Sequence, residues 1–157
     1  MLPDDTAGLV DRVRQHYDDG CFACGRKNPA GLHLDQFSLT DGTVEASFSP
    51  RPEYRGVVGS LHGGVAATAL DEILAWAGIL NLGLMSVTAT LDLRYRSPLT
   101  TDRRLLVRGR VDDASGRRLR VSGELISGDQ PAVTARGVYV ATSTVADLLG
   151  LSAHERT

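Results

Sequence analysis

The sequence predicts an α+β fold in which one long central helix packs against an antiparallel sheet of about six strands. Two observations lead to this prediction. Residues 61–77 carry apolar side chains every three or four positions, which is the period of a helix with one buried face. The segments on both sides alternate apolar and polar residues and are joined by short turns rich in Gly and Asp, which is typical of antiparallel strands.

The same two periods place the remaining elements. The central helix has Ser60 as its N-cap and ends near Asn81 or Gly83. Two more helices are expected, over residues 4–18 and 144–150. Six strands are expected, over residues 31–39, 43–49, 86–98, 104–111, 117–126 and 132–142. The hairpin dipeptide Asp41-Gly42 joins the first two strands, and the turns DDASG and SGDQP join the last three.

Length and composition indicate a single globular domain. The chain has 157 residues, of which 42% are hydrophobic and 23% charged, enough for one sizeable core. We divide it into a helix and Cys-containing leader over 1–30, a core over 31–143 and a tail over 144–157. The net charge of −2 does not favour polyanion binding, and 5% aromatic residues are too few for a nucleic-acid stacking platform.

The N-terminal segment is polar and acidic, unlike a signal peptide, and no apolar run is expected to reach the about 20 residues of a membrane span. We therefore expect a cytoplasmic protein with neither a nucleic-acid nor a membrane partner.

Two cysteines, Cys21 and Cys24, form a Cys-x-x-Cys pair. Such a pair is typical of a redox site, of half a zinc site, or of neither. His16 and His33 flank the pair and supply the number of ligands that a structural zinc site needs, although His33 falls in an expected strand. Gly25 and Pro29 favour a loop over the helix of a thioredoxin-type site. We favour two reduced thiols in a packed loop and no metal.

The triplet His62-Gly63-Gly64 opens the central helix. Backbone N–H groups at a helix N-terminus lack partners within the helix, and the helix dipole adds partial positive charge there. Such an end suits an anion or a polarised carbonyl oxygen. The alternative is that the two glycines only allow close packing of helix on sheet.

Two adjacent carboxylates, Asp71 and Glu72, lie in the middle of this apolar helix. Buried without partners they would be costly, so either their face is solvent-exposed or one of them is a general base or nucleophile. They point about 100° apart around the helix, so the two do not line one site, and we favour Asp71.

His62 and Asp71 are nine residues apart, which on a helix means a rise of about 13–14 Å and about half a turn. They cannot act together within one copy of the helix. If both serve one site, a second chain must bring them together, for example across a two-fold axis with two sites per dimer.

The segment HGGVAATALDEILAWA resembles the central-helix motif of the hotdog-fold thioesterases, in particular the phenylacetate-pathway (PaaI-like) group. In that group His-Gly-Gly opens the helix and an acidic residue follows nine positions after the His. The strand SVTATLDLRYRSPL and the leader CFACGRKNPAGLHL are also similar to family segments, so the resemblance covers residues 20–143.

The resemblance implies a hotdog fold, a homodimer or dimer of dimers, and hydrolysis of an acyl thioester of coenzyme A or acyl carrier protein. The Gly63 amide would polarise the carbonyl, with His62 orienting that region and Gly64 beside it. Asp71 of the neighbouring protomer would be the general base or the nucleophile. Thr88 would help to position water or Asp71. No metal or organic cofactor is implied beyond the coenzyme A or phosphopantetheine of the substrate. An Asn found in some members six residues before the His is Gly56 here.

Strict alternation in the strand over 86–98 places Thr88, Arg94 and Arg96 on one face, and this pair of arginines is the candidate handle for coenzyme A phosphates. The alternative is that these arginines are solvated on the outer face of the sheet and bind nothing. Glu72 is a further candidate for substrate contact. Other candidates for the phosphate contact are Arg55, Arg103 and Arg136.

No Gly-x-Ser-x-Gly, P-loop or dinucleotide-binding pattern is present in the sequence. Two other functions on the same fold stay open: an enoyl-thioester lyase or hydratase, disfavoured because no second His lies in the helix, and a non-catalytic acyl-thioester binding protein. The acyl group is open as well.

Overall fold

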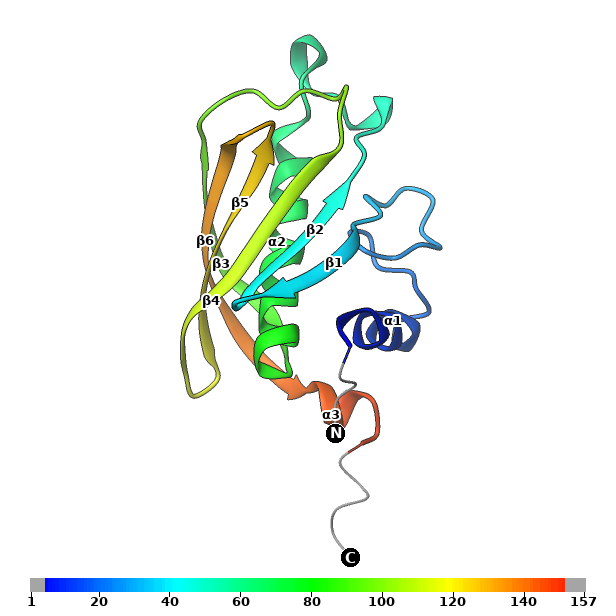
Figure 1. Ribbon diagram of the computed structural model, residues 1–157, viewed down its shortest axis with the longest axis vertical. Helices are drawn as coiled ribbons and strands as arrows, with labels where there is room; N and C mark the ends of the chain where they lie inside the picture. The colour runs from blue at the N-terminus through cyan, green and yellow to red at the C-terminus, as the bar shows by residue number, and fades with distance from the viewer. Residues whose placement is uncertain (1–4, 152–157) are drawn as a thin grey trace, which may run out of the picture.

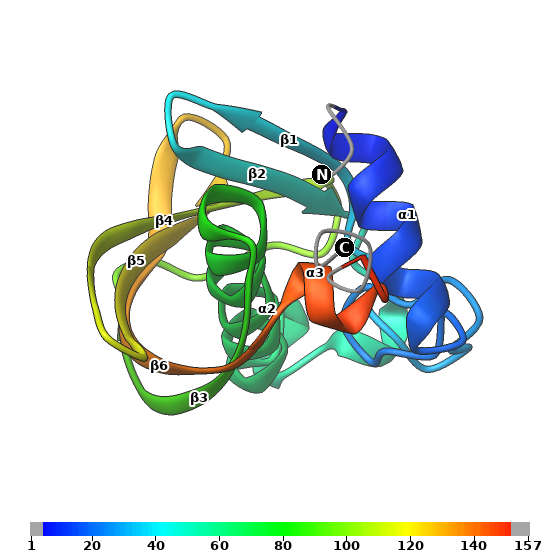
Figure 2. The same cartoon turned by 90° about the horizontal axis from the view of Figure 1, so that it is seen from below.

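A six-stranded antiparallel sheet curls around one long helix in this protein, and the computed structural model describes residues 5–151 apart from the side chain of Val58 (Figures 1 and 2). The helices are α1 (Thr6–His16), α2 (Gly63–Leu82) and α3 (Val145–Leu148), with two 3₁₀ turns at Pro52–Tyr54 and Val57–Gly59. The strands are β1 (Asp35–Thr40), β2 (Thr43–Phe48), β3 (Leu84–Tyr95), β4 (Leu105–Ser115), β5 (Arg118–Ser127) and β6 (Gln130–Thr144). The predicted fold class is confirmed. The predicted helix start at residue 4 and the tail over 152–157 lie outside the described residues.

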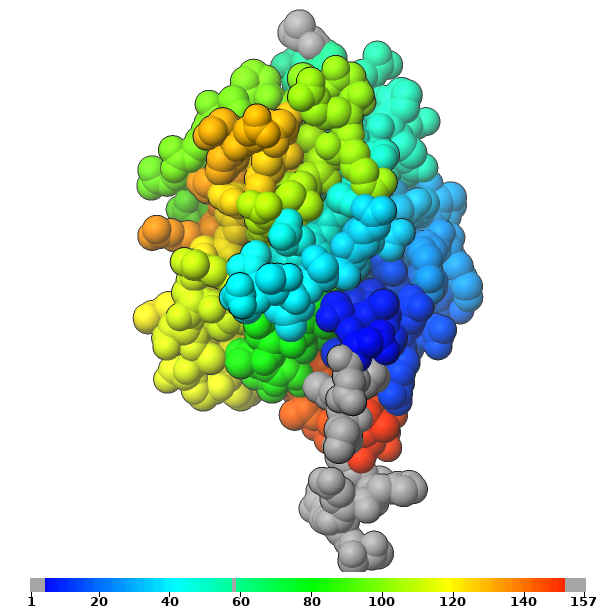
Figure 3. All heavy atoms as spheres, viewed as in Figure 1, coloured from blue at the N-terminus to red at the C-terminus, as the bar shows by residue number. Residues whose placement is uncertain are grey.

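The strands pair in the order β1-β2-β4-β5-β6-β3, so β1 and β3 form the two edges. Seen from below, the sheet wraps α2 on one side, while α1 and α3 lie on the other side (Figure 2). In the space-filling view α1 lies directly below the β1–β2 hairpin (Figure 3). This arrangement leaves β3, a strand of 12 residues, as a long unpaired edge in the single chain.

The limits of α2 follow from its two end residues. His62 has extended backbone, and its ring Nδ1 accepts the Gly64 N–H at 2.9 Å, which makes it the N-cap. Gly83 adopts left-handed backbone with φ 64° and ends the helix, as predicted. Ser60, the predicted N-cap, instead donates its hydroxyl to Val57 O at 2.7 Å, so the helix begins later than expected.

By length and composition α2 is also a helix that a membrane could accommodate, with a mean hydropathy of 1.4 over 18 residues. The expectation that no run reaches this length was therefore wrong. The core helix of a globular protein passes the same test, and half of this window is buried inside the fold.

Two predicted turns are shorter in the structure. The residues DDAS of the first turn continue β4, and the chain reverses at Gly116, which has φ 57°. In the second turn, SGDQP, Ser127 ends β5 and Gln130 begins β6. The β1–β2 hairpin turns at Asp41-Gly42 as predicted, with φ 49° and 77°, the left-handed values that a two-residue hairpin requires.

Two glycines let α2 approach the middle of the sheet. Gly109 of β4 and Gly123 of β5 are cross-strand partners. A Cβ atom at Gly109 would lie 3.0 Å from Ile73 O, and one at Gly123 would lie 3.0 Å from Leu74 Cδ2 and 2.4 Å from the Arg108 carbonyl oxygen. The absence of side chains at this pair sets the distance between α2 and the sheet, and with it the position of every α2 side chain.

We expect Gly123→Ala to lower the free energy of unfolding by about 1–3 kcal/mol, because the added methyl group overpacks the contact of α2 with the sheet. Urea denaturation at equilibrium measures this. Gly20→Ala is the matched control, since a Cβ there would meet its nearest atom, Tyr17 O, at an ordinary 3.5 Å. Equal stability of the two variants would contradict the role assigned to the glycine pair.

Candidate functional site

The N-terminus of α2 keeps one backbone amide unused. His62 Nδ1 takes the Gly64 N–H, and the His62 carbonyl oxygen takes the N–H groups of Val65 and Ala66 at 2.9 and 3.3 Å. No described residue accepts the Gly63 N–H. Gly63 therefore presents a free donor at the positive end of the helix dipole.

The two glycines differ in why they are needed. A Cβ at Gly64 would lie 3.0 Å from His62 Nδ1, so a side chain there would press against the capping ring. A Cβ at Gly63 would meet the Tyr95 ring at 3.4 Å, an ordinary contact. Close packing thus explains Gly64 better than Gly63, and the Gly64 amide is already used within the cap.

A pocket of about 540 Å³ opens at this end of the helix. Among its lining residues are His62, Gly63, Tyr95 and Arg96. Tyr95 donates its hydroxyl to the Gly63 carbonyl oxygen at 2.6 Å and so fixes the first turn of α2. Gly56 also lines the pocket, and a Cβ there would lie 3.1 Å from His62 Cα. The position where some family members carry Asn is thus next to the cap.

The Asp71 carboxylate is held through a single oxygen atom. Asp71 Oδ1 accepts the Thr88 hydroxyl at 2.6 Å and the Tyr139 hydroxyl at 2.6 Å. No described residue donates to the second carboxylate oxygen, Oδ2. Because Asp71 is only partly buried, Oδ2 is free to contact water or a ligand in a fixed orientation. The predicted neighbourhood of Asp71 and Thr88 is present.

Sequence reasoning missed Tyr139. This side chain is fully buried on β6, and burial, followed by its hydrogen bond to Asp71, raises the pKa of its hydroxyl well above the usual range. It is therefore a hydrogen-bond donor at any physiological pH. The sequence did contain a signal for it: Tyr139 carries the one hydroxyl on a strand face whose other side chains are small and apolar, namely Val133, Ala135 and Ala141.

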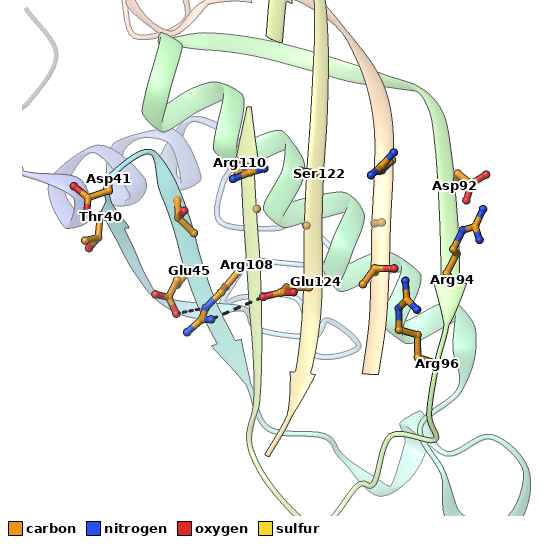
Figure 4. Close-up of a pocket in the computed structure, with 16 residues that line it drawn as sticks. Thr40, Asp41, Glu45, Asp92, Arg94, Arg96, Arg108, Arg110, Ser122 and Glu124 are labelled. Carbon is orange, nitrogen blue, oxygen red and sulfur yellow. Dashed lines mark hydrogen bonds and ion pairs between the residues drawn. The ribbon is translucent and has the colours of Figure 1, made fainter. Parts of the chain in front are cut away.

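The arginines Arg94 and Arg96 do not share a face with Thr88, so this prediction was wrong. Thr88 pairs with Tyr139 and Thr90 with Val138, which makes Ala89 an additional, bulged residue. The bulge reverses the alternation, so that Leu91 and Leu93 pack on the core and both arginines face outward (Figure 4).

A larger hollow, of about 1080 Å³, lies on this outer face of the sheet. Its lining includes Arg136. Figure 4 shows Arg94 and the ion pair of Arg108 with Glu45 on the side of the sheet away from α2. Asp71 and Gly63 are not among its lining residues, so its size does not mark the site. Arg96 lines both this hollow and the pocket beside Gly63.

Glu72 points to the leader and away from Asp71. Its Oε1 accepts the Trp76 indole N–H at 2.9 Å and lies 3.7 Å from Cys21 Sγ. Ligating atoms of Cys21, Cys24 and Glu72 all lie within 4.8 Å of one another. The zinc set weighed from the sequence is not assembled, because His33 Nε2 contacts Asn28 O at 2.6 Å and His16 packs on the Tyr17 ring.

These three groups shift one another's proton affinity. The pKa of Cys21 falls to about 5, chiefly because of hydrogen bonding from the Cys24 thiol. The backbone N–H groups of Cys24 and Ala23 lower it further. The same hydrogen bond, together with burial, raises the pKa of Cys24 far above its usual range. Burial, and next the charge of Cys21, raises the pKa of Glu72 to about 7.

Comparison with known proteins finds similarity to one family over the region that contains α2. The model of the thioesterase superfamily matches residues 58–134. An uncharacterized protein of Schizosaccharomyces pombe is 32% identical over 102 residues, which cover 61% of this chain and 58% of that relative. The match thus spans less than two thirds of that relative's length.

Solved structures agree on the fold. A thioesterase superfamily protein superposes with a TM-score of 0.73 at 24% identity, over 85% of this chain and 76% of that one. The E. coli PaaI protein from the phenylacetic acid degradation operon gives 0.71 at 16% identity, over 88% and 96%. A Streptococcus mutans protein bound to acetyl CoA gives 0.65 at 20% identity, over 71% and 90%.

The α2 helix inside a curved antiparallel sheet is the hotdog fold of these neighbours, and PaaI is among them. Residues 58–134, which include the whole of α2, match the model of the thioesterase superfamily.

Proposed function

We propose that this protein hydrolyses an acyl thioester, carried by coenzyme A or an acyl carrier protein, to the free acid and the thiol. The observation that carries the proposal is the combination of an unused amide at the α2 N-terminus with a carboxylate that two hydroxyls hold through one oxygen. The match of residues 58–134 to the thioesterase superfamily model supports the same reaction class.

In the proposed reaction the thioester carbonyl oxygen accepts the Gly63 N–H. Negative charge develops on that oxygen as the tetrahedral intermediate forms, and a fixed donor at a helix N-terminus stabilises it without reorganisation. His62 holds the first turn through its cap on Gly64, and Tyr95 holds it through the Gly63 carbonyl oxygen.

Asp71 supplies the second half of the reaction through Oδ2. As a general base it takes a proton from a water that attacks the carbonyl carbon; as a nucleophile it attacks that carbon itself, and water then hydrolyses the anhydride. In either case the C–S bond breaks and the thiol leaves. These groups perform both steps with neither a metal nor an organic cofactor.

Gly63 and Asp71 lie more than two turns apart on one helix, so we propose that each site combines Gly63 of one protomer with Asp71 of the other. The long β3 edge is the candidate interface: Val87 and Tyr95 are 56% and 53% exposed, and Thr88 lies on the same edge strand. Pairing of this edge with its copy would place both Asp71 carboxylates near the interface.

Coenzyme A is the carrier that the comparisons favour, because one neighbour of the same fold was solved with acetyl CoA bound. Arg96 is the best placed candidate to meet a phosphate, since it lines the pocket beside Gly63. Arg94 lines only the outer hollow and is the weaker candidate.

The first test is thiol release from a panel of acyl-coenzyme A substrates. We expect Asp71→Asn to lower the rate by about 10²- to 10⁴-fold, the contribution usual for a positioned base. Asp92→Asn is the matched control, because Asp92 is an exposed aspartate on the outer face of the edge strand β3. A folded Asp71→Asn protein with full activity would eliminate this site. No release by wild type would favour a carrier-protein substrate, a lyase or a binding protein.

Tyr139→Phe tests how Asp71 is held. We expect kcat to fall by about 10- to 100-fold with KM nearly unchanged, since one hydrogen bond to a charged group contributes roughly 1.5–3 kcal/mol. Steady-state kinetics on the best substrate measure this. Tyr17→Phe, at an exposed tyrosine, is the control. A change in KM alone would contradict a role through Asp71.

A mixed dimer tests the shared site. Gly63→Pro removes the amide donor at a position where Pro fits the helix, and the extended backbone of His62 (ψ 135°) tolerates a following Pro. Each homodimer, Gly63→Pro or Asp71→Asn, should be inactive. The purified heterodimer should recover about half of wild-type kcat, because one of its two sites then has both groups intact. An inactive heterodimer would place both groups of a site in one chain.

A further inference from the structure

The leader brings Cys21 and Cys24 to one side of a single helical turn. The Gly25 N–H donates to Cys21 O at 2.9 Å, so the cysteines are spaced three apart on a turn, where side chains are neighbours. Gly25 is packed so tightly that a Cβ would lie 2.4 Å from Cys21 N. The turn therefore holds the two thiols together.

Hydrogen bonds hold this turn against the rest of the protein. The two residues between the cysteines accept from the chain beyond: Phe22 O from the Leu32 N–H and Ala23 O from the Leu34 N–H, both at 2.9 Å. Asp19 binds Arg26 on the other side of the turn, at 2.7 Å from Nε. The thiol pair is thus a fixed feature of the fold.

The two thiols have different surroundings. Cys24 is buried, at 4% exposure, whereas Cys21 is partly exposed. Cys21 Sγ lies 3.7 Å from Glu72 Oε1, and its Cys24 and Ala23 neighbours in the turn lower the pKa of its thiol to about 5, which favours a thiolate. An accessible thiolate beside a buried thiol is the arrangement of an attacking and a resolving cysteine.

Glu72 supplies a proton acceptor at the buried thiol. It extends from α2, and its Oε1 accepts the Trp76 indole N–H at 2.9 Å. One of its carboxylate oxygens lies within 4.8 Å of both sulfur atoms. A carboxyl group with a pKa of about 7 exchanges protons readily at neutral pH. A metal centre is less well supported, because the cluster offers three ligands among the described residues and a structural zinc site uses four.

We propose that Cys21 and Cys24 form a redox-active dithiol that exchanges with low-molecular-weight disulfides and closes to an intramolecular disulfide, with Glu72 as the proton acceptor for Cys24. This site is separate from the proposed hydrolytic site and does not depend on it.

The Cys21 thiolate attacks one sulfur of the small disulfide, forms a mixed disulfide and releases the other half as a thiolate. Glu72 takes the Cys24 proton, the Cys24 thiolate attacks Cys21 Sγ, and the second small thiolate leaves. The protein dithiol loses two electrons and the small disulfide gains them; the leaving thiolates are protonated from Glu72 and water.

The experiment treats the full-length protein with oxidised glutathione and follows intact mass and free thiols. We expect wild type to lose both thiols together with the mass of two hydrogen atoms. Cys24→Ser should stop at one bound glutathione, and Cys21→Ser should not react, because Cys24 is buried. Glu72→Gln should form the mixed disulfide at the wild-type rate and close it at least about 10-fold more slowly at pH 7. A purely structural glutamate would not slow the second step alone.

The pH dependence of Cys21 alkylation by iodoacetamide gives an independent readout. The titratable groups that face Cys21 are Cys24 from its own turn and Glu72 from α2. Because the lowered pKa keeps Cys21 ionised above about pH 5, the rate should hold from pH 8 down to about pH 6, where an ordinary thiol with a pKa of about 8.5 is almost unreactive.

Three results would overturn the proposal. The first is that wild type keeps both thiols in oxidised glutathione, and the second is that it accumulates the mixed disulfide without closure. The third is that the purified protein carries one equivalent of zinc, with both thiols unreactive until a chelator removes it. Elemental analysis before the reaction separates this last outcome from the others.

Discussion

Burial of the apolar helix α2 inside a single curved sheet is the constraint on which the other features depend. Burial of Leu70, Leu74 and Trp76 stabilises the fold, and the glycine pair Gly109 and Gly123 allows the helix backbone to approach the sheet closely enough for it. Polar contacts of the helix remain at its two ends and on the sides that face β3 and the leader. The candidate hydrolytic groups lie at two of these places, Gly63 on the first turn and Asp71 beside the edge strand β3.

The bulge at Ala89 connects that constraint to the site. Without the additional residue, one face of β3 would present either Thr88 or Leu91 to the helix, but not both. With it, Thr88 reaches the Asp71 carboxylate while Leu91 continues the core and Tyr95 binds the first turn of α2. A local irregularity thus lets one strand both orient the carboxylate and hold the helix end.

Periodicity was enough to predict the fold, because each element is amphipathic and the turns carry their own residue signals. The hairpin at Asp41-Gly42 and the helix end at Gly83 follow from backbone preferences that a sequence displays. The contact of Tyr139 with Asp71 joins residues far apart in the chain, and no local pattern encodes it. The bulge escaped prediction for a similar reason, since strict alternation was the simplest account of the strand.

The adjacent carboxylates of α2 show how one helix separates two chemistries. Asp71 faces β3 and β6, whose hydroxyls bind one oxygen of an otherwise accessible carboxylate. Glu72 points about 100° away into the leader, where burial and a neighbouring thiolate favour its protonated form. The first environment keeps an anion oriented for attack on a carbonyl or on water. The second favours a carboxyl group that gains and loses a proton near neutral pH, which is the property that exchange with a buried thiol requires.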